Sequence, residues 1–437
     1  MAKGRNSPIS TPHTDAAAGN GLLDRRWFLR QGGVLAGAVS AGAAGLLAAG
    51  EARAETLQVP TWTKEPVRGF TAYGQPSRFE AGVARGPVRE RDPLYAAGPG
   101  AVLTPHHALE GMITPSGLHF EITHNGIPDI DPAAHRLLIH GMVKKAQVFT
   151  LDALSRYPMT SRMHFVECAG NSGALYQPKP AAVGVQATHG LVSCSEWTGV
   201  SLALLLEEMD VDPKAQWLLA DGADPASVSR SIPLAKAMDD AMIALYQNGE
   251  RIRPSNGYPM RLLVPGYQGN MNVKWLRQLK LTAGPSQTRY ETSRYSMLLA
   301  DGSAAQFKFQ LDAKSVITRP SPGFSIAGPG LYEISGMAWS GNGTIAKVEV
   351  SADGGKSWAE AQLAGPILPK AVTRFRIPWR WTGAPAVLQS RATDSTGYVQ
   401  PTREAVLAAR GTKNFYHFNG IASWGVAESG ELTHVYA

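Results

Sequence analysis

Short apolar runs alternate with short amphipathic stretches between about residues 117 and 281. Two compact apolar runs, 135–143 (HRLLIHGMV) and 261–266 (RLLVPG), are bounded by polar or turn residues, which predicts buried strands. Two stretches, 150–158 (TLDALSRYP) and 201–209 (SLALLLEEM), space their apolar residues as one face of a helix does. Strands and helices do not alternate regularly, so the pattern predicts an α+β domain rather than a doubly wound sheet.

The pattern changes after about residue 317, because helical spacing nearly vanishes from there to Arg410. Asp353, Gly354 and Gly355 lie between two alternating runs and are typical of a tight β-turn. Several short strands at this spacing predict a β-sandwich of immunoglobulin type. The proline-rich TRPSPG segment separates the two patterns, so we expect a mixed α/β domain over 111–316 and a β-sandwich domain with a C-terminal tail over 317–437.

The N-terminus has the pattern of an export signal. Arg25 and Arg26 are followed by an apolar run rich in glycine and alanine and then by an EARA sequence. A charged start, an apolar middle and small residues at the end are typical of secretory signals, and the paired arginines indicate the twin-arginine route. We therefore expect 1–54 to be a twin-arginine signal cleaved after Ala54, 55–110 to be an irregular arm, and the mature protein to lie in the periplasm.

The composition narrows the choice of partners. The 42 Lys and Arg exceed the 35 Asp and Glu by a formal net charge of +7 without basic runs, so no nucleic-acid partner is expected. No further segment is apolar and long enough to span a bilayer, so no membrane partner is expected. Cys168 and Cys194 are too few for a disulfide framework, although one bridge between them is open. No Cys-x-x-Cys-His occurs, so we expect no c-type haem in this chain.

Cys168 lies in 164–173 (HFVECAGNSG), between an apolar run and a cluster of small residues. On residue type alone it can be a buried thiol, half of a disulfide, a nucleophile or a metal ligand. The small residues let the backbone approach a large ligand closely, and consecutive N–H groups can cradle an anion. A thiolate beside such a cradle suits a soft metal held by an anionic organic cofactor. Export of an already folded chain favours the same interpretation, because a cofactor is then inserted before translocation.

Four segments together resemble the sulfite oxidase family of molybdenum enzymes. They are 167–171 (ECAGN), 195–208 (SEWTGVSLALLLEE), 231–252 (SIPLAKAMDDAMIALYQNGERI) and 256–281 (NGYPMRLLVPGYQGNMNVKWLRQLKL). The β-rich C-terminal part resembles the dimerisation domain of that family. The resemblance implies a molybdenum-molybdopterin cofactor with one pterin, and a homodimer formed through the C-terminal domain.

By this resemblance, Cys168 is the thiolate ligand of molybdenum, and the other ligands are the dithiolene sulfurs of the pterin and oxygens. Such a centre accepts two electrons from a sulfur substrate and takes oxygen from water, while the protein supplies orientation and electrostatics. Tyr295 matches an active-site tyrosine of the family that hydrogen-bonds near the metal-bound oxygen. A plain buried tyrosine is the alternative for this position.

The resemblance also assigns residues to the pterin. Arg261 matches the arginine that pairs with the pterin phosphate, which suits its forked guanidinium, and a solvated surface arginine is the alternative. Asn256 stands where the family usually has a cofactor-binding histidine, and Asp224 matches a pterin-contacting aspartate. The remaining positions in the matched segments are His124, Asn125, Asn272, Val273 and Lys274.

Three positions depart from the family pattern. Gly173 and Ile122 stand where sulfite oxidases have arginines, and Ala187 stands where they have a pocket tryptophan. Each charge-assisted hydrogen bond contributes about 1.5–3 kcal/mol, so free sulfite is expected to bind poorly. The small residues at Gly173 and Ala187 also predict a more open entrance, which suits sulfur carried on a flexible arm of another protein.

These departures, with 185–199 (VQATHGLVSCSEWTG) and 415–425 (FYHFNGIASWG), resemble the sulfane dehydrogenase branch of the family. That resemblance implies oxidation of sulfane (persulfide) sulfur on a sulfur-carrier protein during thiosulfate oxidation, with a separate c-type cytochrome subunit as electron acceptor. Arg410 matches a C-terminal family arginine that helps to hold the anionic product. The alternatives are a periplasmic sulfite dehydrogenase and a non-catalytic scaffold subunit.

The second cysteine stays open at this point. Cys194 can be a structural thiol beneath the cofactor or a contact to the substrate sulfur. His189, five residues earlier, can face the same pocket.

Overall fold

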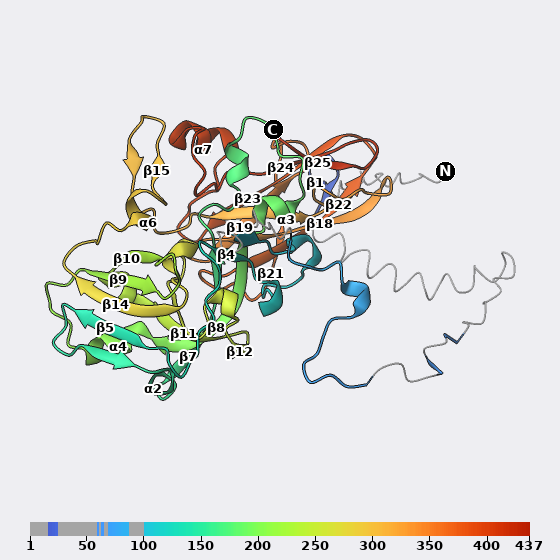
Figure 1. The fold of residues 1–437 in the computed structure, drawn as a ribbon. Coiled ribbons are helices and arrows are strands. Elements are labelled where there is room, and N and C mark those ends of the chain that lie inside the picture. The colour runs from blue at the N-terminus through green and yellow to red at the C-terminus, as the bar shows by residue number, and fades with distance from the viewer. Residues whose placement is uncertain (1–15, 25–58, 61–62, 65–68, 87–99) are drawn as a thin grey trace, which may run out of the picture. The chain divides into compact units, whose positions relative to one another are not determined.

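The computed structural model describes residues 16–24, 59–60, 63–64, 69–86 and 100–437 (Figure 1). Ala16–Leu23 packs in one compact unit with the described residues from Arg85 to Ala437, and the described residues between Asp24 and Ala84 belong to a second unit. Within that second unit lies the 3-10 helix η3 (Arg78–Glu80). The predicted twin-arginine pair, apolar run and cleavage site lie outside the described residues. In the described part of the chain, no helix is long and apolar enough to cross a membrane.

Two sheets of five strands each form the first domain in the described part of the chain. One has the order β10-β9-β14-β5-β6, in which only β14 and β5 are parallel. The other has the order β12-β11-β8-β7, and β13 also pairs with β11. The strands are β5 (Leu137–Gly141), β6 (Gln147–Phe149), β7 (Met159–Glu167), β8 (Val192–Ser201), β9 (Trp217–Gly222), β10 (Ser229–Pro233), β11 (Met242–Gln247), β12 (Glu250–Arg251), β13 (Arg261–Leu263) and β14 (Leu276–Thr282).

Both helices that the sequence predicts are present, although the first is shorter than expected. α2 (Leu151–Leu154) is a single turn, and the Thr150 hydroxyl accepts a hydrogen bond from Ala153 N at its start. α4 (Leu202–Glu208) buries three leucines on one face, which is the spacing that predicted it. The other helical turns of this domain are η5 (His106–Ala108), η6 (Ser116–Leu118), η7 (Gly173–Tyr176), α3 (Val185–His189), α5 (Leu234–Asp239), η8 (Pro254–Asn256), η9 (Gly269–Met271) and α6 (Arg289–Thr292).

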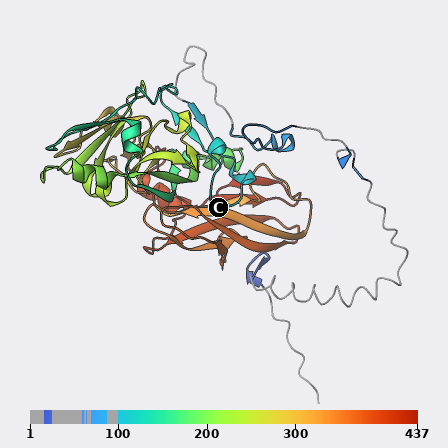
Figure 2. The ribbon, with the colours of Figure 1, turned by 90° about the horizontal axis from the view of Figure 1, so that it is seen from below.

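The predicted β-sandwich is confirmed, and Figure 2 shows its orange strands as a layered body beside the green first domain. In the described residues, one sheet has the order β1-β2-β22-β18-β17, with β21 also on β22, and the other has the order β20-β19-β23-β24-β25. The predicted turn forms, with Gly354 and Gly355 at φ of 72° and 84°. The strands are β1 (Ala16–Ala18), β2 (Leu22–Leu23), β17 (Lys314–Arg319), β18 (Gly330–Trp339), β19 (Ile345–Ser351), β20 (Ala359–Glu360), β21 (Gln362–Ala364), β22 (Thr373–Trp381), β23 (Ala386–Asp394), β24 (Ser423–Val426) and β25 (Leu432–Val435).

Two features differ from the sequence pattern. A helix, α7 (Arg403–Arg410), occupies a region where little helix was expected, and its weak signal is explained because only Val406 is buried. Regular structure also begins before residue 110, because β3 (Gly100–Val102) pairs with β4 (Glu121–Thr123) beside the first domain. A further two-stranded ladder joins β15 (Met297–Leu298) to β16 (Ala304–Ala305).

A buried ion pair joins the two domains next to Cys168. Lys314 of β17 and Glu167 of β7 are 3.0 Å apart, and their side chains are only 2% and 5% exposed. Trp339 Nε1 donates a hydrogen bond to Glu167 at 2.7 Å, and Asn171 Nδ2 donates another at 2.8 Å. The carboxylate is therefore paired and hydrogen-bonded, as a buried charge requires.

We expect Lys314→Met to destabilise the folded protein by about 3–5 kcal/mol, because it leaves the Glu167 charge buried without its cation. The free energy of unfolding in urea measures the effect. Arg376→Met is the control, because Arg376 makes exposed ion pairs with Glu110 and Glu333 that are worth about 1 kcal/mol or less. Equal losses in the two variants would contradict the assignment.

Candidate functional site

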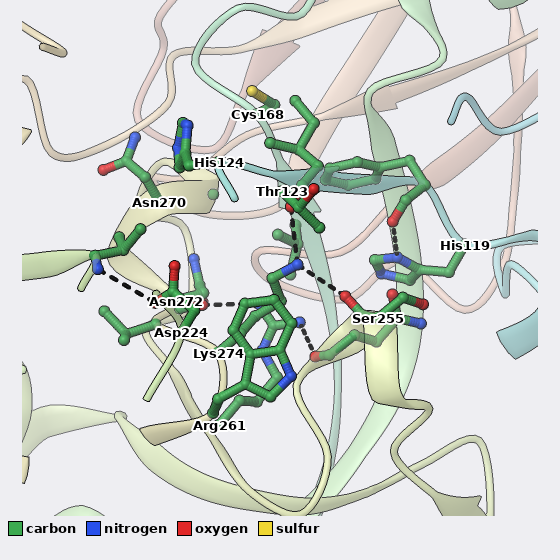
Figure 3. Close-up of a pocket in the computed structure, with 18 of the residues that line it drawn as sticks. His119, Thr123, His124, Cys168, Asp224, Ser255, Arg261, Asn270, Asn272 and Lys274 are labelled. Atoms are coloured by element: carbon green, nitrogen blue, oxygen red, sulfur yellow. Dashed lines mark hydrogen bonds between the residues drawn. The ribbon is translucent and has the colours of Figure 1, made fainter. Parts of the chain in front are cut away.

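A cavity with about 700 Å³ of space free of protein atoms, part of it open to solvent, lies in the first domain. Its wall comes from β4, the loop after β7, η8, β13 and η9, and from the segment 272–275. Figure 3 shows Cys168 at one end and Arg261 at the opposite end. The cavity therefore offers a thiol and a cationic end to one elongated ligand.

The loop that presents Cys168 is tightly bonded. Cys168 N donates to Leu191 O at 2.9 Å, and Asn171 N donates to Cys168 O at 2.9 Å. A Cβ on Gly269 would lie 2.8 Å from Glu167 O, so η9 passes this loop at a distance that only glycine permits. The cluster of small residues thus forms the close-packed loop that the sequence predicts.

Both cysteines are free, so the open alternative of a bridge between Cys168 and Cys194 is not realised. Burial raises the pKa of the Cys168 thiol to about 11, and Glu167 adds to the rise. Among the described residues, no histidine ring is hydrogen-bonded to its sulfur, and a thiol with a raised pKa is a poor nucleophile. Metal binding requires and stabilises the thiolate, so a ligand role suits this position better than nucleophilic catalysis.

Arg261 is a buried cation with no carboxylate ion-paired to it among the described residues, and it is 3% exposed. Its guanidinium donates to Asn256 O and to Asn272 O, both at 2.9 Å, and lies 5.0 Å from the centre of the Trp197 ring. Its Nε is buried without a hydrogen-bond partner. Burial lowers its pKa to about 9. The alternative of a solvated surface arginine is therefore excluded, and an anion would satisfy the orphaned donor.

Lys274 is the second cation of the cavity wall. Its Nζ donates to Ile122 O and to Ser255 O, both at 2.8 Å, and lies 4.3 Å from the centre of the Trp275 ring. Burial lowers its pKa to about 7, and the charge on Arg261 lowers it further. An anion bound between Lys274 and Arg261 would offset both effects.

Four more predicted residues line the same cavity: Asn256, Asn272, Val273 and Asp224. Asn272 is locked, because its Oδ1 accepts from Val264 N at 2.7 Å. Asn256 Nδ2 donates to Gln247 at 3.2 Å. These bonds fix the amide groups in the wall before any ligand arrives.

His124 and Tyr295 also line the cavity, and the structure brings them together. His124 Nε2 and the Tyr295 hydroxyl are hydrogen-bonded at 2.8 Å. Asn125, in contrast, is exposed and lies outside the wall. A second, smaller cavity of about 280 Å³ also contains Cys168, and Asp312 and His417 are among its lining residues. Arg410 lines neither cavity, but its guanidinium donates to His417 O and pairs with Asp312 at 3.3 Å. Its geometry is that of a residue that fastens the C-terminal segment.

Sequence reasoning missed His119. Its Nδ1 is 2.9 Å from Phe120 O, and its buried Nε2 has no partner and lines the cavity. Burial lowers its pKa to about 3, so the ring is neutral and Nε2 presents a lone pair to the cavity. The sequence expectation concerned position 256, where the family histidine is replaced, and nothing in the sequence pointed to position 119. The other lining residues that were not predicted include Thr123, Ser255, Asn270 and Trp275.

The predicted opening of the entrance at Gly173 is wrong. A Cβ at Gly173 would lie 2.6 Å from Phe415 O and 2.7 Å from the Phe415 ring, and a Cβ at Gly170 would lie 2.6 Å from the same ring. The C-terminal segment therefore fills the space that a larger residue would take. Phe415 itself is 53% exposed, so it places an aromatic surface beside the loop of Cys168.

The remaining positions lie away from the cavity. Ala187 is in α3 and lines neither cavity at Cys168. His189 is buried, and its Nδ1 is 2.7 Å from the Ser172 hydroxyl. Cys194 lies on β8, is 1% exposed and packs in the hydrophobic core, which supports the structural alternative for this thiol.

Comparison with known proteins identifies two regions of the chain. An oxidoreductase molybdopterin binding domain matches residues 124–290, and a Mo-co oxidoreductase dimerisation domain matches residues 305–423. Sulfite oxidase from Gallus gallus is 29% identical over 338 residues, which are 72% of each chain. The NADH nitrate reductase of Ulva prolifera is 29% identical over 309 residues, which are 63% of this chain and 36% of that protein.

This chain belongs to the sulfite oxidase family of molybdenum oxidoreductases. Within that family it is similar to a crystal structure of the sulfane dehydrogenase SoxCD from Paracoccus pantotrophus. The two are 45% identical with a TM-score of 0.83, and the match covers 87% of this chain and 98% of that chain.

The residues present fit the cofactor of this family. The half-buried Cys168 thiol at one end suits the metal, and the unpartnered Arg261 Nε at the other end suits the phosphate. The lone pair on His119 Nε2 can accept a hydrogen bond from the ring system between them.

The lowered pKa of Lys274 predicts how the stability of the cofactor-free protein depends on pH. Its pKa is about 7 in the folded chain and about 10.4 in an unfolded one, so between these values the unfolded chain holds the extra proton. Stability should therefore rise with pH from about 7 to 10, whereas below pH 7 the full cost of the buried charge remains. Lys274→Met should flatten this rise by up to about 1.4 kcal/mol per pH unit, measured as the free energy of urea unfolding. Lys280→Met, at an exposed position of β14, is the control. Parallel profiles for wild type and Lys274→Met would refute the assignment.

Proposed function

We propose that this protein oxidises sulfane (persulfide) sulfur on a sulfur-carrier protein during thiosulfate oxidation in the periplasm, and passes the electrons to a c-type cytochrome subunit. The observation that carries the proposal is the absence of a cationic side chain at positions 122 and 173. Ile122 lines the cavity where sulfite oxidases have an arginine, and Phe415 covers Gly173 where a second arginine would stand. The similarity to a sulfane dehydrogenase supports the same conclusion.

The cofactor in this proposal is molybdenum-molybdopterin with one pterin, without haem in this chain. When bound, it supplies the two-electron oxidation of sulfur with oxygen derived from water. Cys168 would hold the metal through its thiolate, and Arg261 and Lys274 would bind the phosphate. His119 would orient the ring system by accepting a hydrogen bond.

Tyr295 would hold a proton at the reacting end. Burial raises its pKa well above the usual value, and the nearby Cys168 adds to the rise, so the phenol stays protonated. Its hydroxyl is fixed by His124, and its ring packs 5.3 Å from the ring of Tyr416. With His124 Nε2–H donating to the phenol oxygen, the one phenol proton would be held ready to donate a hydrogen bond beside Cys168.

Phe415 would form the rim over which the substrate arrives. A sulfite dianion gains little from an aromatic surface, whereas a neutral peptide arm bearing a persulfide can pack on it. The C-terminal domain would form a homodimer, because it matches the dimerisation domain of the family. The leader would direct the folded, cofactor-loaded chain to the periplasm by the twin-arginine route.

Replacement of the thiol tests the metal assignment. Cys168→Ser is expected to change the free energy of unfolding of the cofactor-free protein by less than about 1 kcal/mol. Turnover should fall at least 1000-fold, because the metal loses its protein ligand. Bound molybdenum and its paramagnetic resonance signal are measured alongside turnover with a persulfidated carrier. Cys194→Ser, in the hydrophobic core, is the matched control and should keep the signal. An unchanged signal in Cys168→Ser would remove Cys168 as the ligand, and absence of molybdenum and pterin from the wild type would favour the scaffold alternative.

Restoring one arginine tests the substrate assignment. Ile122→Arg is expected to raise kcat/KM for free sulfite by about 10- to 100-fold, because a charge-assisted contact is worth about 1.5–3 kcal/mol. The main-chain carbonyl that Lys274 uses stays in place, and Ile122→Met controls for side-chain length. Steady-state kinetics with free sulfite and with persulfidated carrier give the comparison. Rapid turnover of micromolar sulfite by the wild type would overturn the proposal in favour of a sulfite dehydrogenase.

A further inference from the structure

The chain segment just ahead of Arg25 and Arg26 has a place in the folded protein. β1 and β2 form a hairpin that belongs to the β22-containing sheet of the sandwich, with Leu22 paired to Trp379 (Figure 1). Leu22 is fully buried within the sandwich core, and Leu23 is 7% exposed. Residues 16–23, which the sequence assigns to a leader that is cleaved off, thus form two strands of the sandwich in the full-length chain.

Main-chain and side-chain bonds hold the hairpin. Arg380 N donates to Gly21 O at 2.8 Å, which extends the β-sheet by one ladder bond. Trp379 Nε1 donates to Asn20 O at 2.9 Å, and Asn20 Nδ2 donates to Ala352 O at 2.7 Å. These partners come from β22 and from the loop after β19, so the binding place exists only when both sheets of the sandwich have formed.

The turn of the hairpin fits this place closely. Gly19 N donates to the Ser357 hydroxyl at 2.7 Å, and a Cβ on Gly19 would lie 2.3 Å from a carboxylate oxygen of Asp353. A Cβ on Gly21 would lie 2.0 Å from Arg380 O, and Gly21 has a φ of 86°. Gly21 is therefore required for docking, because its Cβ would meet a main-chain carbonyl and its φ is in the left-handed region.

The hairpin covers a sheet edge that is otherwise open. β21 pairs with β22 only at Arg374–Arg376, and β2 pairs with it at Trp379. An uncovered edge strand of this kind is a template for pairing with other chains. Loss of the hairpin would leave the C-terminal half of β22 and the Leu22 pocket exposed.

We propose that Ala16–Leu23 is a docking strand of the precursor, which closes the edge of β22 once the C-terminal domain has folded and slows proteolysis at the arginine pair that follows it. Cleavage after Ala54, which the sequence predicts, would remove this strand and reopen that edge. Docking depends neither on the export route nor on the sulfur chemistry, so it can fail while the proposed function holds.

Hydrogen exchange of the Arg380 amide in the full-length chain tests the docking. Gly21→Val, which drives a side chain into Arg380 O, should accelerate exchange of this amide at least tenfold. Ala17→Val, at an exposed position of β1, should leave it unchanged. Equal exchange in wild type and Gly21→Val would overturn the proposal.

Limited proteolysis tests the shielding. A protease must hold several residues on each side of the cleaved bond in an extended form, so docked Leu22 and Leu23 should slow tryptic cleavage after Arg25. Leu22→Asp should raise the rate of this cleavage at least tenfold relative to cleavage after Arg53 in the same chain, whereas Ala16→Asp should not.

A peptide of residues 15–24 (DAAAGNGLLD) added to the Leu22→Asp chain should restore slow exchange of the Arg380 amide, and the same peptide with Leu22→Asp should not. Rescue shows that the edge of the variant is folded and vacant. An unchanged cleavage rate in Leu22→Asp, or no rescue by the wild-type peptide, would sink the proposal.

Discussion

The site depends on one buried carboxylate, that of Glu167. It lies directly before Cys168 in the chain and binds Lys314 and Trp339 of the C-terminal domain and Asn171 of its own loop. Loss of the Lys314 cation would leave this charge unpaired at a cost of about 3–5 kcal/mol, and the Trp339 and Asn171 bonds stabilise the carboxylate further. The C-terminal domain is therefore more than a dimerisation module, since it supplies two of the three groups that fix the proposed metal ligand.

At the other end of the cavity, the buried charges have no ionic partner among the described residues. Arg261 and Lys274 are buried with main-chain carbonyls and aromatic rings as neighbours, and no ion-paired carboxylate is present among the described residues. Their lowered pKa values record the cost of that burial. The charge of Glu167 is balanced by groups of the protein itself, whereas the charges of Arg261 and Lys274 would be balanced by a bound anion. Binding of the anionic cofactor should therefore stabilise the folded chain.

What the sequence could predict was local. The leucine spacing of α4 and the alternating run that forms β19 are properties of neighbouring residues, and both elements form. Cys168, Arg261 and Lys274 stand in continuous matched segments, and the structure brings them to one cavity. Asn125 and Arg410 also stand at matched positions, but neither lines that cavity, and their assigned roles stay predictions.

What the sequence could not predict was contact between distant segments. His119 enters the wall because the η6–β4 turn passes β8, where its ring packs 5.8 Å from Trp197, and no spacing rule announces such a contact. The Gly19-Asn20-Gly21 turn signals a hairpin, but its partner strand lies more than 300 residues away. Hydrophobic pattern sets which face of an element is buried, whereas the partner of that face is decided by topology.

The proposed substrate preference depends on the same packing between distant segments. From the sequence, glycine at position 173 predicts that an arginine is missing and that the entrance is open. In the structure, Phe415 fills that space, and its main-chain carbonyl lies against Gly173. The segment is fastened on both sides, because His417 N donates to Ala169 O at 2.7 Å and Arg410 donates to His417 O. An arginine at position 173 would therefore have to displace a segment that is anchored to the loop of Cys168, the proposed metal ligand. The proposed preference against free sulfite therefore depends on how the C-terminal segment packs against the loop of Cys168, and Arg410 holds that segment by donating to His417 O.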